Sequence, residues 1–571
     1  MGRTVLMGTP VSGGVAMGVV RYLDVDYDSF IKEYIPTDKD GELARFVLAL
    51  KNAKADLDEI LSEGEKLSAE EEDIIDMHLM LLDDVGFIEA IKRRIKEGLG
   101  TPASIQKAVA DFKNMFEGMD DEYLRDRAND VVDVGNRVLR KLLGMPETKV
   151  EGENLVIVAK DVEPALMAGF SEDKVKAVVL ENGSKTSHSV IIAKSKGFVT
   201  LVGVDVSKAS ESDGCTALVD AKDGSVVISP DKGEEDAFAK KCEEYEKEAG
   251  YLASRAGDPA VSLDGRRIKV AANVAGPDEM GKAAQMGCEG VGLYRTEFLF
   301  MDSEDLPDEE KQTAAYRALL AKAGGNLCII RTLDIGGDKK CRCLDLMPEE
   351  NPFLGYRAVR ICLDKKDMFK TQLRSLIKAS AFGKLGIMIP MIDTVTEIKE
   401  AKALFEEAKK ELRGEGVAFD EEILFGIMTE TPASVMMAAD FAKYVDFFSI
   451  GTNDLVQYTM AVDRGNGLVA YLYDYFDPAV VRAIYTIAKA GKDAGIMVGM
   501  CGEMAGDVLA APLLMAMGLD ELSMSPSVAP EVKERIRTCR SDDVDLDKVL
   551  SFETAKDVRE YLEGLLNKGT C

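Results

Sequence analysis

From residue 260 onward, short apolar runs alternate with helical patterns, and this alternation constrains the fold more than any other feature. Helical spacing of apolar residues fills the stretches between the runs, as at 396–412 and 480–494. Such alternation is typical of a parallel sheet and predicts a (β/α)8 (TIM) barrel with insertions, although the pattern leaves a doubly wound sheet open. The strand-like runs are residues 268–274, 290–294, 327–331, 385–391, 423–429, 447–451 and 497–501, with an eighth expected near 356–363.

The first part of the chain predicts a small α/β domain interrupted by helices. Strand-like runs lie at 5–23 and again in five runs between residues 154 and 229, whereas residues 39–144 show helical spacing. We therefore expect both sets of strands to build one small α/β domain. Together with the barrel, this domain makes the chain a multidomain α/β protein. The expected parts are an α/β domain from 1–23 and 147–230, an all-helical insertion at 24–146, a linker helix at 231–259 and the barrel at 260–571.

Charge and hydropathy limit the partners of the chain. Its 101 acidic and 71 basic side chains give a formal net charge of -30, and such a field repels nucleic acids and anionic membranes over most of the surface. No run of about 18 apolar residues could cross a bilayer. The first residues, Met1-Gly-Arg-Thr-Val-Leu, lack the apolar core of a secretion signal. We expect a cytoplasmic protein that neither binds nucleic acid nor inserts into a membrane.

Only two histidines, His78 and His188, occur among the 571 residues. A Ser-His-Asp triad, a histidine zinc site or a histidine proton relay must therefore use one of them. The ten cysteines give no zinc pattern either, because no C-x-x-C is present and Cys341 and Cys343 form the only close pair. We expect most of these thiols to be reduced.

Polar side chains follow the strands that the pattern numbers second, third, sixth, seventh and eighth. In a TIM barrel these strand ends meet at one face, where catalytic residues lie. Arginines bind phosphate bidentately, and carboxylates without histidine or thiolate neighbours suit Mg²⁺. Structural ion pairs are the alternative for any one charged residue, and a buried inert thiol is the alternative for the cysteine. The residues are Arg295, Glu297, Arg331, Asp334, Glu430, Asn453, Asp454, Arg464 and Cys501, with Arg357 and Arg360 near the weak fourth strand.

His188 lies where a predicted strand at 175–180 turns into a helix rich in Ile and Ala, beside Thr186 and Ser187. Backbone N–H groups and the dipole at a helix N-terminus favour negative charge, so a histidine there could carry a phosphoryl group. A capping Thr-Ser pair with an incidental histidine is the alternative. His78 lies on one face of a predicted helix and is interpreted as a structural or interface residue.

Together these motifs resemble enzyme I of the bacterial phosphoenolpyruvate:sugar phosphotransferase system, along essentially the whole chain. Related dikinases and synthases share the histidine and barrel motifs but carry an ATP-grasp module, for which this chain has no spare length; a Walker-type phosphate loop is absent too. The matching motifs are Thr186-Ser-His188, Arg331-Thr-Leu-Asp-Ile-Gly-Gly-Asp-Lys339, Glu350-Asn-Pro-Phe-Leu-Gly-Tyr-Arg357, Gly451-Thr-Asn-Asp-Leu455 and Met500-Cys-Gly-Glu503.

The resemblance implies a Mg²⁺-dependent phosphoenolpyruvate-protein phosphotransferase of the sugar-uptake system. Phosphoenolpyruvate would bind at the barrel mouth, and His188, on a swivelling domain, would take its phosphoryl group with release of pyruvate. His188 would then pass the group to a histidine of the carrier HPr, docked on the helical insertion, and the chain would form a homodimer through the barrel. By match, Arg295, Arg331 and Arg464 would bind the phosphate, Glu430 and Asp454 would hold Mg²⁺, Asn453 would orient the substrate with Arg357 close by, and Cys501 would protonate the enolate carbon.

The turn before His188 departs from the family pattern. Gly183-Ser-Lys stands where the family usually has Gly-Gly-Arg, and Lys194 stands where it commonly has arginine. Lysine keeps the charge but loses the bidentate fork of arginine. Two other functions therefore stay open. One is a weakened paralogue that regulates through phosphorylation, and the other is an ATP- or pyrophosphate-using dikinase relative, against which the missing module argues.

Overall fold

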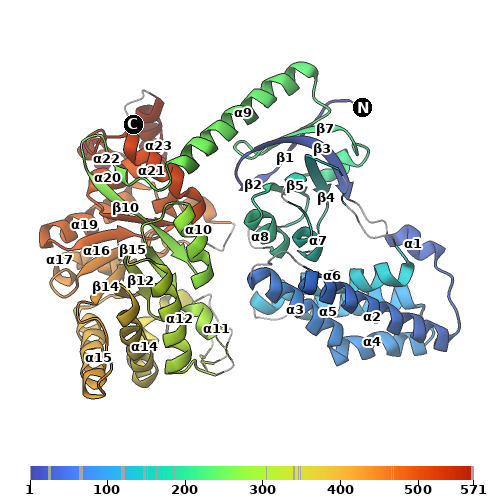
Figure 1. The fold of residues 1–571 in the computed structure, drawn as a ribbon, viewed down its shortest axis with the longest axis horizontal. Helices are drawn as coiled ribbons and strands as arrows, with labels where there is room; N and C mark the ends of the chain where they lie inside the picture. Colours follow the sequence, from blue (N-terminus) through green and yellow to red (C-terminus); the bar gives the residue numbers. More distant parts are fainter. Residues whose placement is uncertain are drawn as a thin grey trace. The chain divides into compact units, whose positions relative to one another are not determined.

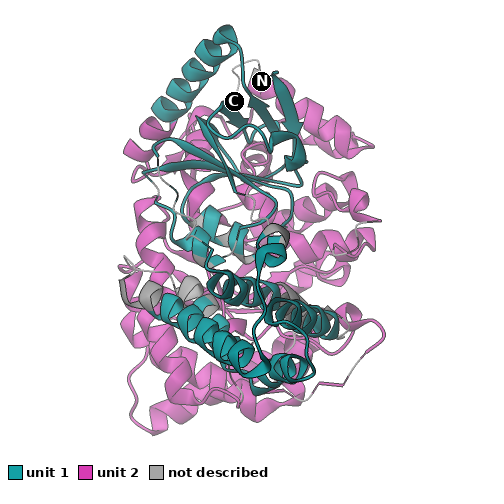
Figure 2. Cartoon of the chain, turned by 90° about the vertical axis from the view of Figure 1, so that its right-hand side faces the viewer, with its two compact units in different colours: residues 1–248 teal, residues 249–571 magenta. Residues whose placement is uncertain are grey.

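The structure, a computed structural model, divides the chain into two compact units, residues 1–248 and 249–571 (Figures 1 and 2). Each unit is described by itself. The finer boundaries expected from the sequence stay predictions. The described residues are 2–23, 27–63, 69–117, 122–145, 150, 152–162, 164–171, 173–183, 187–301, 303, 305–337, 341, 343–344, 346–347, 349–464, 466 and 468–567.

Unit 1 contains an eight-stranded mixed sheet that combines strands from both sides of a helical segment. Its strand order is β1-β8-β7-β3-β4-β5-β6-β2, and the parallel centre places Val19 of β3 opposite Leu155 of β4. Alternate residues of β4 face opposite sides: Leu155 and Ile157 pack toward α7 and α8, whereas Val156 packs on the other face. The bounds are β1 Thr4–Met7, β2 Thr9–Ser12, β3 Val15–Leu23, β4 Leu155–Ala159, β5 Val175–Leu180, β6 Val199–Val202, β7 Thr216–Asp220, β8 Ser225–Ile228, α7 Pro164–Ala168 and α8 His188–Ser195.

Helices fill the segment between β3 and β4, as the apolar spacing predicts. They share a core that includes Phe46, Leu57 and Ile91, all fully buried. Residues 97–100, which include Gly98 and Gly100, separate α4 from α5, whereas Gly64 and Gly118 lie outside the described residues. The bounds are α1 Tyr27–Glu33, α2 Lys39–Glu63, α3 Ala69–Asp83, α4 Val85–Lys96, α5 Thr101–Glu117 and α6 Glu122–Leu143, and the charged helix α9 follows the sheet at Lys232–Ser254.

Unit 2 is a closed barrel of eight parallel strands, β10 to β17, in sequence order, with β11 pairing back to β10. The predicted TIM barrel is therefore confirmed, and the doubly wound sheet is excluded. A ninth short strand, β9 (Ala260–Val261), pairs antiparallel with β10. The barrel strands are β10 Arg267–Val274, β11 Val291–Arg295, β12 Cys328–Arg331, β13 Leu385–Ile389, β14 Leu424–Thr429, β15 Phe447–Ile450, β16 Met497–Met500 and β17 Glu521–Met524.

Helices cover the outside of the barrel, and side chains fill its interior. Leu293, Met388, Met428 and Phe447 belong to the inner cluster, which Cys501 also joins. Among the described residues every helix is too short or too polar to cross a lipid bilayer. The helices of the unit are α10 Met280–Gln285, α11 Glu297–Met301, α12 Glu309–Lys322, α13 Val359–Asp364, α14 Lys366–Ala379, α15 Val395–Gly414, α16 Pro432–Met436, α17 Ala438–Phe441, α18 Thr452–Met460, α19 Pro478–Ala494, α20 Ala511–Met517, α21 Ala529–Thr538, α22 Leu546–Ser551 and α23 Ala555–Asn567.

One strand prediction is wrong. Residues 356–363 do not form the fourth strand; they enter helix α13, and the missing strand is β17 near the end of the chain. A short apolar run with β-branched residues fits a strand and a buried helix equally well. The correction renumbers the later strands, so that Glu430 follows the fifth strand, Asn453 the sixth and Cys501 the seventh.

Candidate active site

The strand ends of the barrel bring the predicted polar residues to one mouth. Arg295 and Arg331 end the neighbouring strands β11 and β12 and lie opposite each other in the register. Glu430 follows β14, and Asp454 lies in the first turn of α18, directly after β15. Cys501 follows β16. These positions follow from the parallel barrel, in which all strand ends of one kind meet at the same face.

A cavity of about 590 Å³ opens at this mouth. Three of the predicted residues line it: the exposed guanidinium of Arg295, the half-buried amide of Asn453 and the thiol of Cys501. Its size is that of a small-molecule site. Other residues of the lining are Asn273, Glu279, Tyr475, Glu503, Asp507 and Ser525.

Two buried arginines form a network with acids beside the cavity. Arg331 pairs with Glu297 and, at 2.9 Å, with Asp334, which also accepts a 2.9 Å hydrogen bond from Arg357. Arg357 reaches Asp454 at 3.5 Å. Burial works to lower the pKa of both guanidiniums, but the charges of the neighbouring acids, Asp334 first, outweigh burial and raise it. Both arginines therefore stay charged, which suits an anionic ligand.

Glu430 and Asp454 form an acidic pair that fits a hard cation. Glu430 is 1% exposed and accepts a 2.7 Å hydrogen bond from the Met391 N–H. Burial, with the charges of Asp454 and Asp334, raises the pKa of Glu430 to about 8. Oδ1 of Asp454 is buried without a hydrogen-bond partner. Two crowded carboxylates with an unsatisfied oxygen are ligands of the kind that Mg²⁺ takes.

Cys501 is 5% exposed and lies between the apolar interior and the mouth. Ser449 Oγ donates a hydrogen bond to its sulfur at 3.3 Å, and Asn273 Nδ2 donates to its carbonyl oxygen at 3.0 Å. Burial raises the pKa of the thiol to about 11, although the Ser449 hydrogen bond and Arg331 act to lower it. The thiol is therefore protonated at neutral pH and could serve as an acid.

The remaining predicted barrel residues differ in how firmly they are held. The Asn453 side chain accepts from the Glu503 N–H at 2.9 Å and donates to the Glu503 carboxylate at 3.3 Å, which fixes its amide at the cavity wall. Arg464 is exposed, and its backbone N–H donates to Gln457 Oε1 at 3.2 Å. Asp338 and Lys339 of the matched motif lie outside the described residues.

The loop after β12 passes directly against Arg357. Gly336 has φ +104°, and a Cβ added there would lie 2.5 Å from Arg357 Cβ. Only glycine adopts this conformation and leaves this space. Gly336 of the sequence motif is therefore explained by its close approach to Arg357.

His188 begins helix α8, so the strand and the helix of the predicted setting are both present. Ser187 is the N-cap residue with extended φ and ψ, and Gly183 in the turn has φ +114°. Thr186, Ser184, Lys185 and the side chain of His188 lie outside what the structure describes. His78 is 1% exposed in the helical core, with Nε2 3.6 Å from Asp130, so the interface alternative does not hold for the chain in this structure.

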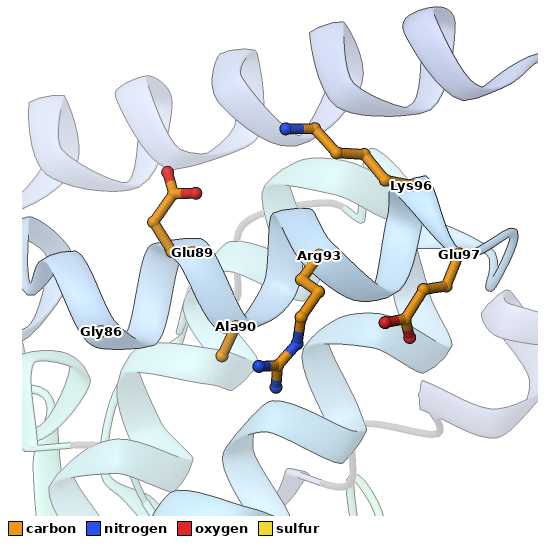
Figure 3. Close-up of a pocket in the computed structure, with 6 residues that line it drawn as sticks. All are labelled: Gly86, Glu89, Ala90, Arg93, Lys96 and Glu97. Atoms are coloured by element: carbon orange, nitrogen blue, oxygen red, sulfur yellow. The ribbon is translucent and has the colours of Figure 1, made fainter.

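A second hollow lies along α4 in unit 1, with a volume of about 640 Å³ (Figure 3). Its side chains carry both charge signs, and none of the predicted site residues lines it. Figure 3 shows the side chains of Glu89 and Lys96 on one side of α4 and those of Arg93 and Glu97 on the other. Mixed exposed charges select no particular ligand, so the barrel mouth is the stronger candidate.

Sequence reasoning missed two residues that contact Cys501, Asn273 and Ser449. Asn273 is the last but one residue of β10, so a search of strand ends could also have identified it. Ser449 lies within the run Phe-Phe-Ser-Ile of β15, where a single small polar residue gives no signal. Its contact with Cys501 depends on the register of β15 against β16.

Comparisons with known proteins were made along the whole chain. Three family models match in order: the N-terminal domain of PEP-utilising enzymes at residues 7–127, their mobile domain at 151–224 and their PEP-binding domain at 251–541. A solution structure of an enzyme I protein aligns with 42% of this chain and 99% of its own, at 27% identity and a TM-score of 0.34.

Curated relatives match along nearly the full chain. The phosphoenolpyruvate-protein phosphotransferase of Priestia megaterium is 40% identical over 99% of both chains. Those of Bacillus subtilis (strain 168) and Staphylococcus carnosus (strain TM300) are 39% and 40% identical over 98% of this chain and 99% and 98% of their own. The resemblance inferred from the motifs is confirmed: the chain belongs to the family of phosphoenolpyruvate-protein phosphotransferases.

Proposed function

We propose that this chain transfers a phosphoryl group from phosphoenolpyruvate to His188 and then to a histidine of HPr, the first step of sugar uptake by the phosphotransferase system. In the first step the bond between phosphorus and the enol oxygen breaks, and a bond from phosphorus to a ring nitrogen of His188 forms. The observation that carries the proposal is the group of buried arginines and acids beside the Cys501 thiol at the barrel mouth.

The arginines would bind and orient the substrate. Arg295, Arg331 and Arg464 would hold the phosphate, with Arg357 close by, and Asn453 would orient the bound molecule from the cavity wall. The attacking group would be a neutral imidazole. Alignment of the reactants and neutralisation of charge stabilise a loose, metaphosphate-like transition state more than covalent catalysis does. Because acids fix the two buried guanidiniums in place, their charges are oriented before the substrate arrives.

Glu430 and Asp454 would hold Mg²⁺, the metal that the family implies and that the donor set fits. Mg²⁺ supplies charge neutralisation at phosphate oxygens when it is bound. The raised pKa of Glu430 supports this assignment, because a metal cation beside the carboxyl group would favour its ionised form.

Cys501 would supply the proton that completes pyruvate. After phosphoryl transfer the leaving group is the enolate, and the S–H proton of Cys501 passes to its C3 carbon, which leaves a thiolate. A thiol that is protonated at neutral pH and lies at the cavity wall meets both requirements of a general acid.

Family membership supports the partners and location that we propose. HPr would dock on the helical insertion at 24–146, the domain of residues 1–23 and 147–230 would swivel, and two copies would associate through the barrel at 260–571. The protein would act in the cytoplasm, where sugar phosphorylation takes place. The acidic net charge of -30 would attract a basic carrier surface.

The test is labelling with radioactive phosphoenolpyruvate and Mg²⁺. We expect acid-labile, alkali-stable label on the wild-type chain, no label on His188→Ala, and transfer of the label to added HPr. An unlabelled wild-type chain would contradict the proposal. Label that never moves to HPr would favour the regulatory paralogue, and label taken from ATP instead would favour the dikinase relative.

A further inference from the structure

Cys501, the thiol assigned to proton transfer, has a polar neighbour, Ser449, to which the proposed reaction gives no role. Ser449 is 2% exposed on β15 and faces the barrel interior, two residues after Phe447 of the apolar inner cluster. A buried hydroxyl among apolar side chains costs free energy unless it is hydrogen-bonded. Its hydroxyl donates to Cys501 Sγ at 3.3 Å.

The geometry at the sulfur gives the hydroxyl hydrogen of Ser449 and the thiol hydrogen of Cys501 different roles. Ser449 Oγ donates to the sulfur at 3.3 Å, whereas the thiol donates to the Ile450 carbonyl at 3.9 Å, a long and weak contact. The thiol proton is therefore held loosely beneath the cavity, while the sulfur is already solvated by a donor. A donor to sulfur becomes stronger when the sulfur acquires negative charge.

The strand register places the pair together. Ile450 of β15 lies opposite Met500 of β16, and Cys501 N–H donates to the Ile450 carbonyl at 3.1 Å. Asn273 from β10 holds the backbone of Cys501 from the other side, through its carbonyl. Both strands are fixed in the barrel wall, so the contact between hydroxyl and sulfur does not depend on a flexible loop.

Resting on the proposed function, we infer that Ser449 is a positioning residue for Cys501. Its hydroxyl fixes the sulfur at the cavity wall and stabilises the thiolate that remains when the S–H proton passes to C3 of the enolate. The thiolate regains its proton from water once pyruvate leaves, so protons balance. The charged groups that also face this sulfur are Arg331 and Arg295, which favour the thiolate, and Glu430, which opposes it.

The first test measures the thiol without using catalysis. Alkylation of Cys501 by iodoacetamide, followed by mass spectrometry of its peptide, is compared between wild type and Ser449→Ala at about pH 8.5, well below the thiol pKa. Loss of the donor raises the thiol pKa, so we expect about five- to tenfold slower alkylation. An equal or faster rate would overturn the inference.

A matched pair separates the hydroxyl from the shape of the side chain. Ser449→Thr and Ser449→Val have the same shape, and only threonine keeps the donor. We expect threonine to alkylate like wild type and valine like alanine, with thermal unfolding confirming that each variant is folded. Identical behaviour of the two would show a steric effect and reject the positioning role.

The second test separates the two chemical steps. In single turnovers with phosphoenolpyruvate and Mg²⁺, Ser449→Ala should label His188 within about twofold of wild type but form pyruvate about five- to tenfold more slowly. Equal slowing of both would mean a general loss of structure. Cys501→Ser is the control for the proposed function: if it forms pyruvate at the wild-type rate, Cys501 is not the acid, while the alkylation result still decides whether Ser449 governs the thiol.

Discussion

Asp334 is 1% exposed and accepts from both buried arginines of the mouth, Arg331 and Arg357. Removing its charge leaves two guanidiniums close together in a poorly solvated place. We expect Asp334→Asn to lower the free energy of unfolding of the barrel by about 3–5 kcal/mol, measured by urea denaturation. The control is Asp440→Asn, which removes an exposed pair with Lys443 and should change nothing measurable. An equally stable Asp334→Asn chain would mean that solvent reaches these arginines.

Glu430 should make the metal-free barrel less stable as the pH rises. Its pKa is raised by burial, from 4.5 to about 8, so the folded chain binds a proton that the unfolded chain has lost between these values. Stability is therefore highest below about pH 4.5 for this group and falls up to about pH 8, by a few kcal/mol. Unfolding curves measured in a chelator should show this slope, and Glu430→Gln should flatten it.

At the scale of single residues, the sequence predicted which charged residues lie at the barrel mouth better than it predicted the contacts between them. The strand-end rule found Arg295, Arg331, Glu430 and Cys501, because polar residues after apolar runs stand out. It could not find that Asp334 joins the two arginines, because that pairing needs the loop between β12 and α13 to fold back. The orientation of a side chain depends on neighbours that are distant in sequence.

The loop after β12 depends on Gly336. Alanine there would combine φ +104° with a Cβ 2.5 Å from Arg357 Cβ. We expect Gly336→Ala to cost about 2–4 kcal/mol of unfolding free energy and to weaken phosphoenolpyruvate binding, measured by calorimetric titration of His188→Ala background protein. Gly324→Ala is the matched control, because Gly324 has φ +62° and open space around it, so it should cost only about 1 kcal/mol. Equal losses of stability in the two variants would show that the positive φ, and not the contact with Arg357, causes the loss.

Helices α2 and α5 are joined through one buried carboxylate. Glu42, 4% exposed, accepts from the Thr101 N–H at 2.9 Å and from the Thr37 N–H at 2.9 Å. Burial disfavours the ionised carboxylate, but together these hydrogen bonds favour it more strongly and lower the pKa of Glu42 to about 2. The stabilisation is present above about pH 4.5 and is lost as the pH falls toward about 2.

Glu42→Gln should therefore destabilise unit 1 near neutral pH by about 1–3 kcal/mol and reduce its sensitivity to acid. Circular dichroism of the helices against urea, at several pH values, measures both. A variant that keeps the full acid sensitivity would show that other carboxylates control it.

Elements were predictable where their pattern had one interpretation. The seven barrel strands predicted from apolar runs and the helices with clear 3.6-residue spacing follow from local sequence. The eighth strand did not, because β17 is short and carries Glu521 on the interior side, where burial raises the pKa of that carboxyl to about 7. A four-residue strand that contains an acid has the sequence pattern of a loop. The eighth strand was therefore predicted at the apolar segment 356–363 instead.

At the scale of the whole molecule, the buried apolar residues separate by unit. Three clusters of the described residues draw their members from residues 6–228, and two draw theirs from 260–562. None of these clusters includes buried residues of both units. The sequence predicts such separation, since the charged helix α9, with no buried residue, interrupts the apolar pattern. It predicts nothing about the relation between the units, because that depends on contacts and ligands and not on local pattern.

Separate cores predict separate unfolding. We expect differential scanning calorimetry to resolve at least two transitions, one from each unit. In His188→Ala, which cannot consume the substrate, phosphoenolpyruvate with Mg²⁺ should stabilise only the barrel transition, by about 2.7 kcal/mol at about 100 times the dissociation constant. Arg331→Met should abolish that shift while leaving the other transition in place. A single transition that moves as a whole with ligand would contradict the separation, because it would require the two cores to unfold as one.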